Sequence, residues 1–265
     1  MTANEAVERI KKNAGVPWNE KSYRDTFKAG NPDTEVKGIA TTFMATLDLL
    51  QRAQAAGLNF VVTHEPTFWS DTDAVKDLGD DSIYRFKVDY CARNNMVVWR
   101  FHDHLHARKP DMMWVGLARA LGWQNRETNP NRHIYTLPPT TLGALAADVK
   151  RHLNVRALRV VGDPNAKVRT IAVGVGYNIP RVSPDVDVVM GGESPEAGGA
   201  FDDTEYVLDA AFLSKNGLGM NKGQIILGHQ VSEEPGMEDC ANWLRTFITE
   251  VPIQWIRAGE PFFVR

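Results

Sequence analysis

Hydrophobic positions along the chain follow two alternating spacings, which predict strands and helices in turn. Short runs of β-branched and aromatic residues, such as 58–63 and 186–190, are typical of buried strands. Stretches such as 45–56, with apolar residues at helical spacing, are typical of amphipathic helices. Gly57 and Gly122 directly follow two such stretches, where glycine commonly ends a helix. This alternation predicts an α/β fold with largely parallel strand pairing.

The predicted elements repeat the same rhythm in both halves of the chain. The predicted helices cover residues 2–13, 45–56, 82–94, 112–121, 141–152, 203–215 and 234–249. The predicted strands cover residues 36–43, 58–63, 96–101, 132–137, 157–161, 168–175, 186–190, 223–227 and 252–256. Residues 14–35 are expected to be irregular, because glycine and proline interrupt them. We therefore expect two similar α/β lobes, residues 1–127 and 128–265, with the C-terminal part able to pack back onto the first lobe.

Composition narrows the classes of function. The 265 residues include 30 Lys and Arg against 33 Asp and Glu, so the net charge is −3. This near-balance disfavours nucleic acid as a partner. Only 2 cysteines are present, which excludes a disulfide framework and a four-cysteine zinc site. The absence of an apolar signal region and of a run of about 18 apolar residues predicts a cytoplasmic protein with no membrane partner.

Histidine and carboxylate side chains follow four of the predicted strands. They are His64 and Glu65, then His102, His104 and His106, then Glu193, and finally His229 and Glu233. In open α/β sheets, ligands bind beyond the carboxyl ends of the strands. Imidazole and carboxylate groups are ligands of zinc, iron and manganese. The sequence therefore predicts a metal site in a cleft at the strand C-terminal ends, with one or two divalent transition metal ions per chain.

The first two motifs also have explanations without a metal. His64 and Glu65 can form a surface pair that caps a loop. In an extended segment, His102, His104 and His106 would point to one face, which suits either a metal or a solvated sheet edge. The convergence of such groups at several strand ends favours the metal.

The last motif is open to a similar alternative. His229 and Glu233 are four positions apart, but Pro235 follows closely, so a helix is expected to begin near Ser232. Glu233 in its first turn would then complement the helix dipole. The Gly174-Val175-Gly176 segment, at the end of a predicted strand, is interpreted as a tight turn between a strand and a helix.

Three longer segments agree in order and spacing with a known family. Residues 58–66 end in Thr-His-Glu-Pro, residues 102–107 read His-Asp-His-Leu-His-Ala, and residues 228–233 read Gly-His-Gln-Val-Ser-Glu. They resemble a strand followed by His-His-Pro, then His-x-x-Leu-Asp-Ala, then Gly-His-x-x-Thr/Ser-Glu. These are motifs of the Nif-three-like family of dinuclear metal proteins, often labelled type-2 homologues of GTP cyclohydrolase I. Gly192-Glu193 and Pro261-Phe262 fit the same family.

The resemblance implies a set of metal ligands, which are His64, Glu65, His106, His229 and Glu233. Two of these depart from the family pattern, because Glu65 replaces the usual His and His106 replaces the usual Asp. The site can therefore hold one metal instead of two, change its metal preference, or recruit Asp103 or His102. Glu65 or Glu193 is expected to act as the general base if it is not a ligand.

The resemblance also implies a function. We expect a dinuclear metal-dependent hydrolase of the cyclohydrolase or phosphoesterase type, acting on a small molecule such as a nucleotide. A homo-hexamer is expected, with the metal sites facing an interior cavity. The alternative is a non-enzymatic, oligomeric metal-binding scaffold or protein-interaction factor.

Overall fold

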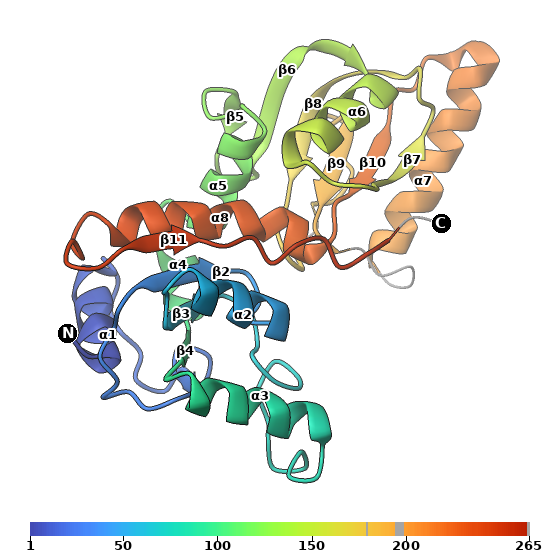
Figure 1. The fold of residues 1–265 in the computed structure, drawn as a ribbon. Helices are drawn as coiled ribbons and strands as arrows, with labels where there is room; N and C mark the ends of the chain where they lie inside the picture. The colour runs from blue at the N-terminus through green and yellow to red at the C-terminus, as the bar shows by residue number, and fades with distance from the viewer. Residues whose placement is uncertain (179, 194–198, 264–265) are drawn as a thin grey trace. The chain divides into compact units, whose positions relative to one another are not determined.

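The structure, a computed structural model, describes residues 1–178, 180–193 and 199–263 (Figure 1). The chain forms two compact units, of which the first contains residues 1–112 and 236–259 and the second contains residues 113–235 and 260–265. Each unit has one β-sheet with helices, so the predicted α/β fold with two lobes is confirmed. The boundary between the two lobes after residue 127 stays a prediction.

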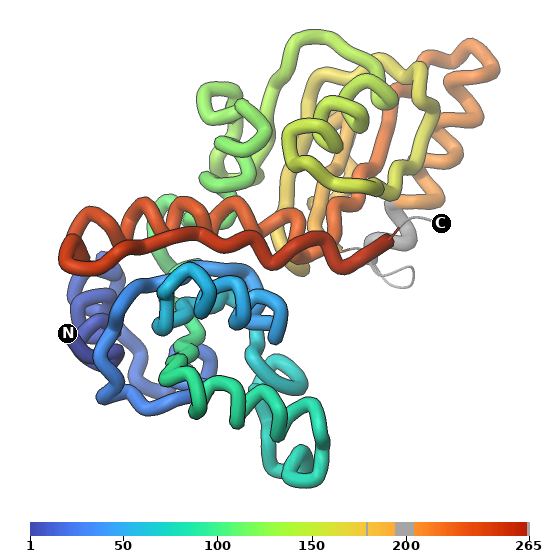
Figure 2. Tube along the Cα trace, viewed as in Figure 1, coloured from blue at the N-terminus to red at the C-terminus, as the bar shows by residue number. Residues whose placement is uncertain are grey.

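The sheet of the first unit has the order β1-β4-β3-β2-β11. Its strands are β1 (Phe27–Ala29), β2 (Ile39–Thr42), β3 (Phe60–Thr63), β4 (Val97–Arg100) and β11 (Ile253–Trp255). All pairs are parallel except β1 with β4. Every residue of β2, β3 and β4 is buried, as expected for parallel strands covered on both faces. Figure 2 shows how the C-terminal part of the chain comes back beside the N-terminal part, where β11 pairs with β2.

The helices of the first unit include α1 (Ala3–Asn13), α2 (Leu47–Ala55), α3 (Ser82–Arg93) and the short α4 (Asp103–Ala107). The first three begin after Thr2, Thr46 and Asp81, whose side chains each accept from a main-chain N–H of the first turn, whereas the side chain before α4 makes no such bond. Thr2 and Glu5 form a reciprocal capping box at the start of α1. Leu49 and Leu50 of α2 belong to the buried core that also contains Val61 of β3. Residues 14–35, expected to be irregular, also contribute β1, which is three residues long.

The sheet of the second unit has the order β5-β6-β8-β9-β10-β7. Its strands are β5 (Glu127–Asn129), β6 (Ile134–Thr141), β7 (Arg159–Gly162), β8 (Lys167–Val173), β9 (Val188–Gly191) and β10 (Gly223–Ile226). Only the β8-β9 and β9-β10 pairs are parallel, so the prediction of largely parallel pairing is wrong for this sheet. The predicted strands at 157–161 and 168–175 follow each other without a helix, and such a connection is too short for a parallel crossover.

The remaining helices are α5 (Met112–Ala120), α6 (Leu142–Leu153), α7 (Gly199–Leu213) and α8 (His229–Leu244), with a π-helical turn at Ser214–Leu218. The Leu142 side chain of α6 lies so close to Gly162 and Gly223 that a Cβ atom on either glycine would be 2.8 or 2.5 Å from it. α6 therefore packs tightly over the β7–β10 edge. Among the described residues, no helix is long and apolar enough to cross a membrane.

Candidate metal site

His64 and Glu65 directly follow β3, and His102 follows the neighbouring strand β4. These strands are parallel and in register, with Thr63 opposite Arg100, so both chain ends leave the sheet at the same edge. The main-chain N–H of His64 and that of Glu65 donate to the carbonyl groups of Thr42 and Phe43 at 3.0 and 2.8 Å, which extends the strand pairing. The parallel topology thus brings the first two predicted motifs together.

Residues 103–107 form the short helix α4, so the three histidines do not share the single face that an extended segment would give them. His102 stands at the N-cap position of α4, and His104 and His106 lie within the helix. The helical conformation forms because the Asp25 carboxylate accepts hydrogen bonds from three main-chain N–H groups at the helix start, at 2.6 to 3.0 Å. A helix places residues four positions apart on one side, so His102 and His106 face together and His104 does not.

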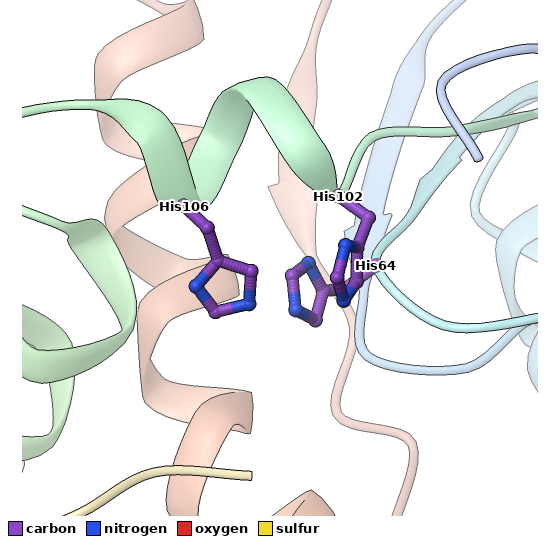
Figure 3. Close-up of side chains that lie close together, drawn as sticks. All are labelled: His64, His102 and His106. Atoms are coloured by element: carbon purple, nitrogen blue, oxygen red, sulfur yellow. The ribbon is translucent and has the colours of Figure 1, made fainter. Parts of the chain in front are cut away.

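Three imidazole rings form one cluster (Figure 3). The ring centroids of His64 and His102 are 4.6 Å apart, those of His64 and His106 are 4.9 Å apart, and those of His102 and His106 are 4.8 Å apart. One ligand atom from each ring lies within 4.8 Å of the others. His64 is fully buried and the other two are half-buried. This spacing can hold a metal ion.

Each ring of the cluster uses Nδ1 for a hydrogen bond to a neighbouring oxygen. His102 donates to Asp103 at 2.9 Å, His106 donates to Asp111 at 2.8 Å, and His64 donates to the Phe101 carbonyl at 3.2 Å. A bond of this kind fixes the tautomer and orientation of a metal-binding histidine, and it leaves Nε2 as the ligand atom. All three imidazoles are therefore oriented in the way that metal ligands require.

The protonation of His102 also suits a ligand. Its burial, and then the neighbouring rings of His64 and His106, lower the pKa of His102 to about 4. A nitrogen must be unprotonated to bind a cation. Near neutral pH, His102 is therefore already in the form that binds metal.

Glu65 lies beside the cluster and is held by a buried arginine. Its Oε2 accepts from Nη2 of Arg100 at 2.8 Å, and its Oε1 is 3.8 Å from Nε2 of His102. Arg100 is fully buried, and it also donates to the His64 carbonyl at 3.0 Å and to the Asp71 carboxylate at 2.8 Å. One carboxylate oxygen of Glu65 is thus fixed by Arg100 while the other stays near the histidines.

The remaining histidines have other surroundings. Nδ1 of His104 donates to Asp25, and its Nε2 accepts from the Asn19 N–H at 2.7 Å. Because both ring nitrogens are used in this way, His104 supports the local fold. His133 and His152 pair with Glu127 and Asp148 in the second unit.

Within the second unit, His229, Glu233 and Glu193 lie together. Nε2 of His229 is 2.8 Å from Oε2 of Glu233, and the His229 main-chain N–H donates to Oε1 of Glu193 at 3.1 Å. α8 begins at His229, so the expectation of a helix start near Ser232 is wrong. Ser232 lies in the first turn, where its hydroxyl donates to the His229 carbonyl at 2.7 Å and accepts from the Gly176 N–H at 2.9 Å.

Gly176 allows the backbone to approach this pair closely. Its φ is +56°, and a Cβ atom here would be 2.3 Å from Oε1 of Glu233 and 3.1 Å from Nε2 of His229. The Gly174–Gly176 segment thus turns tightly after β8, but the next element is strand β9 and not the predicted helix. The segment also lines the His229 and Glu233 pair.

Replacing Gly176 by alanine is expected to destabilise the protein by more than the roughly 1–2 kcal/mol that a positive φ costs a residue with a Cβ atom. The extra loss comes from displacement of the buried Glu233 side chain. Gly122→Ala is a matched control, because Gly122 has φ +71° and nothing lies within 4 Å of its Cβ position. Urea unfolding of both variants would measure the difference. Equal losses would show that Glu233 is not displaced.

Comparison with known proteins identifies the family. The profile of the Duf34/NIF3 (NGG1p interacting factor 3) family matches residues 1–194, which is more than half of the chain. The chain belongs to the Duf34/NIF3 family. The resemblance seen in the sequence motifs is therefore confirmed.

Individual relatives of this Duf34/NIF3 chain are distant in sequence. A protein of Clostridium acetobutylicum named GTP cyclohydrolase 1 type 2 homolog is 23% identical over 155 residues, which are 54% of this chain and 56% of that protein. The match thus spans little more than half of that relative's length. A solved Bacillus cereus protein related to NIF3 is 15% identical with a TM-score of 0.71, and it covers 100% of this chain and 99% of its own. Reduced HcgD from Methanocaldococcus jannaschii is 18% identical with a TM-score of 0.62, and it covers 96% of this chain and 97% of its own. These likenesses show the fold.

Sequence reasoning missed the groups that hold the histidines of the Duf34/NIF3 chain. Asp25, Arg100 and Asp111 all lie outside the recognised motifs. A usable signal was present in the i, i+4 spacing of His102 and His106, which suits two ligands on one helical face. A distant carboxylate that caps the helix leaves no comparable pattern in the sequence.

Proposed function

We propose that this protein is a metal-dependent hydrolase whose cation is held by His64, His102 and His106. The orientation of the imidazoles carries the proposal. In each ring, Nδ1 donates a hydrogen bond to a carboxylate or carbonyl oxygen, which leaves Nε2 as the ligand atom. One ligand atom from each ring lies within 4.8 Å of the others. Metal-binding histidines usually have their other ring nitrogen hydrogen-bonded in this way, which fixes the tautomer and the orientation of the ring.

The donor set indicates which cations fit. Imidazole nitrogen suits zinc and iron better than magnesium or calcium, which prefer oxygen ligands. The carboxylate of Glu65 close to the cluster also keeps manganese among the candidates. When bound, such a cation would polarise a substrate oxygen and lower the pKa of a bound water.

The residues of the chain take separate roles in this proposal. His64 and His106 are ligands, as the resemblance implies, and His102 joins them. Glu65 serves either as a further ligand or as the proton acceptor beside the metal, in a position fixed by Arg100. From the family resemblance, His229 and Glu233, which lie together at the start of α8, are proposed as additional ligands. Glu193, which binds the His229 N–H, is the second candidate proton acceptor.

The name of the clostridial relative supports a nucleotide as the substrate. We propose hydrolysis of GTP or a related small molecule, with a dinuclear centre if two cations bind per chain. From the family resemblance we also propose that the chain works as a cytoplasmic homo-hexamer. Light scattering of the purified protein tests this state, and a clean monomer would contradict it.

Metal-dependent turnover tests the proposed reaction. We expect the metal-loaded protein to hydrolyse GTP or p-nitrophenyl phosphate, and the His64→Ala/His106→Ala variant to lose roughly 100-fold or more of that rate. His133→Ala is the control, because His133 also pairs with a carboxylate but lies outside the cluster. Unchanged turnover in the double variant would contradict the site. Metal binding without turnover of either probe would favour the non-enzymatic scaffold, an alternative that the family name, NGG1p interacting factor 3, supports.

A further inference from the structure

A segment without helix or strand holds the helix that carries two of the clustered histidines. This segment, residues 18–25, is called the clamp segment below. It lies within the stretch that the sequence analysis left as irregular, and four of its residues make polar contacts with α4. α4 itself is only five residues long. A helix of that length is not stable without contacts to the rest of the protein, because the conformational entropy lost in forming the first turn exceeds the stabilisation from its hydrogen bonds.

Asp25 is the centre of the clamp segment. Its Oδ1 accepts from the main-chain N–H groups of His102 and Asp103 at 2.6 and 3.0 Å, and its Oδ2 accepts from that of His104 at 2.9 Å. Oδ2 also accepts from Nδ1 of His104. The Asp25 side chain is fully buried, so these four donors replace water around the charge. One distant carboxylate thus satisfies the N–H groups that a helix start leaves open.

Two other residues of the clamp segment contact the imidazole ring of His104. The Trp18 ring stacks on the His104 ring with centroids 3.6 Å apart and planes 8° apart. The Asn19 N–H donates to Nε2 of the same ring at 2.7 Å. His104 is therefore held by Trp18, Asn19 and Asp25 on the side of α4 that does not face the cluster.

Two further residues of the clamp segment bind Asp103, the hydrogen-bond partner of His102. The Ser22 hydroxyl donates to Oδ2 of Asp103 at 2.7 Å, and Arg24 pairs with Oδ1 of Asp103 at 3.3 Å. Oδ1 of Asp103 in turn accepts from Nδ1 of His102 at 2.9 Å. The clamp segment thus fixes both the backbone of α4 and the orientation of one imidazole.

We propose that Asp25 is a positioning residue of the metal site, which sets the separation of His102 and His106 before a cation binds. The proposal rests on the proposed function, since it assumes that the cluster binds metal. Asp25 touches no cation itself and acts through the backbone of α4. A site that is already ordered loses little conformational entropy when the metal binds, so its affinity for the metal is higher.

The test compares Asp25→Asn with wild type in the whole chain, using Zn²⁺ and Co²⁺ as probes. Asparagine keeps the size of the side chain but replaces an acceptor oxygen with a donor that opposes the N–H groups of α4. We expect zinc affinity, measured by chelator competition, to fall by about 10- to 100-fold, as for other groups that orient ligands. We also expect the visible absorption band of bound Co²⁺ to shift and weaken, which a loss of stability alone would not cause.

Asp81→Asn is the matched control. Asp81 caps α3 in the same unit, where its Oδ1 accepts from the Tyr84 N–H at 2.7 Å, and α3 carries none of the clustered histidines. We expect this variant to lose stability but to bind zinc within about twofold of wild type. The comparison separates positioning of the histidines from helix capping in general.

The outcomes distinguish this inference from the proposed function. Wild-type protein that binds neither Zn²⁺ nor Co²⁺ would overturn both. Zinc binding by wild type and Asp25→Asn with equal affinity and equal Co²⁺ spectra would overturn the role of Asp25 alone. If Asp25→Asn does not fold, Ser22→Ala is the variant that tests the role of the clamp segment. It removes the hydrogen bonds of the Ser22 hydroxyl with the Asp103 carboxylate and the Asp25 N–H, and it keeps the buried charge of Asp25. We expect a measurable fall in zinc affinity for Ser22→Ala, and an unchanged affinity would contradict the clamp.

Discussion

Replacing His106 by alanine is expected to lower the affinity of the protein for zinc by roughly 100-fold or more. The His106 ring lies 4.9 Å from that of His64 and 4.8 Å from that of His102, so it supplies one of three converging nitrogens. Its Nδ1 is already bound to Asp111, so the imidazole is held in place for this purpose. Its loss leaves only two of the three clustered imidazoles, and the cation is then held far more weakly. Chelator competition would measure the change.

Two other substitutions make this result specific. His133→Ala removes a histidine with a similar carboxylate partner, Glu127 at 3.1 Å, and is expected to leave zinc affinity unchanged. His106→Asp replaces one ligand with another, so the loss should be smaller, and the preference should move from zinc towards manganese because oxygen ligands favour the harder cation. Equal zinc affinity in His106→Ala and wild type would show that the cluster is not the binding site.

Replacing Arg100 by methionine is expected to destabilise the protein by about 3–5 kcal/mol, the usual cost of breaking a buried ion pair from one side. Arg100 is fully buried, and its guanidinium group binds Glu65 and Asp71 at 2.8 Å each. Without it, the carboxylate of Glu65 loses the guanidinium group that binds its Oε2. Urea unfolding of the metal-free protein, followed by circular dichroism, would measure the loss.

A second substitution at the partner position separates the charge effect from lost packing. In Arg100→Met/Glu65→Gln, no charge remains at either position, so part of the lost stability should return. Arg52→Met is the surface control, because Arg52 and Asp48 form an exposed pair at 2.7 Å and such pairs contribute about 0–1 kcal/mol. A loss no greater for Arg100→Met than for Arg52→Met would contradict the proposed balance of charges around Glu65.

The sequence predicts most of the fold because local signals and packing agree there. Strands β2, β3 and β4 are apolar runs whose residues are all buried, and their neighbours α2 and α3 end close to the predicted positions. The sequence did not predict β1, because its three residues all have half-buried side chains and therefore show no alternation of hydrophobic and polar positions. In the second sheet, the antiparallel pairs β6-β8 and β7-β10 join strands that are separated by long stretches of chain, and local spacing does not carry that information.

The candidate site is predictable only in part, for a related physical reason. Strand ends predict that His64, Glu65 and His102 lie near one another, and the parallel register of β3 and β4 brings this about. The conformation of residues 102–106 depends instead on Asp25, 77 positions from His102 in the chain. The alternation His-x-His-x-His is also compatible with an extended segment, and the carboxylate of Asp25 favours the helix by accepting from three main-chain N–H groups. Likewise, α8 begins at His229, whose main-chain N–H donates to the carboxylate of Glu193, another residue distant in the chain.

The most direct test of the central claim is elemental analysis of the wild-type protein, purified after growth with zinc, iron and manganese supplied. The His64→Ala/His102→Ala/His106→Ala variant is analysed in parallel, with its fold checked by circular dichroism. The account predicts at least one transition metal ion bound per wild-type chain and a clear loss of metal from the folded triple variant. Wild-type protein with no more metal than the triple variant would contradict it.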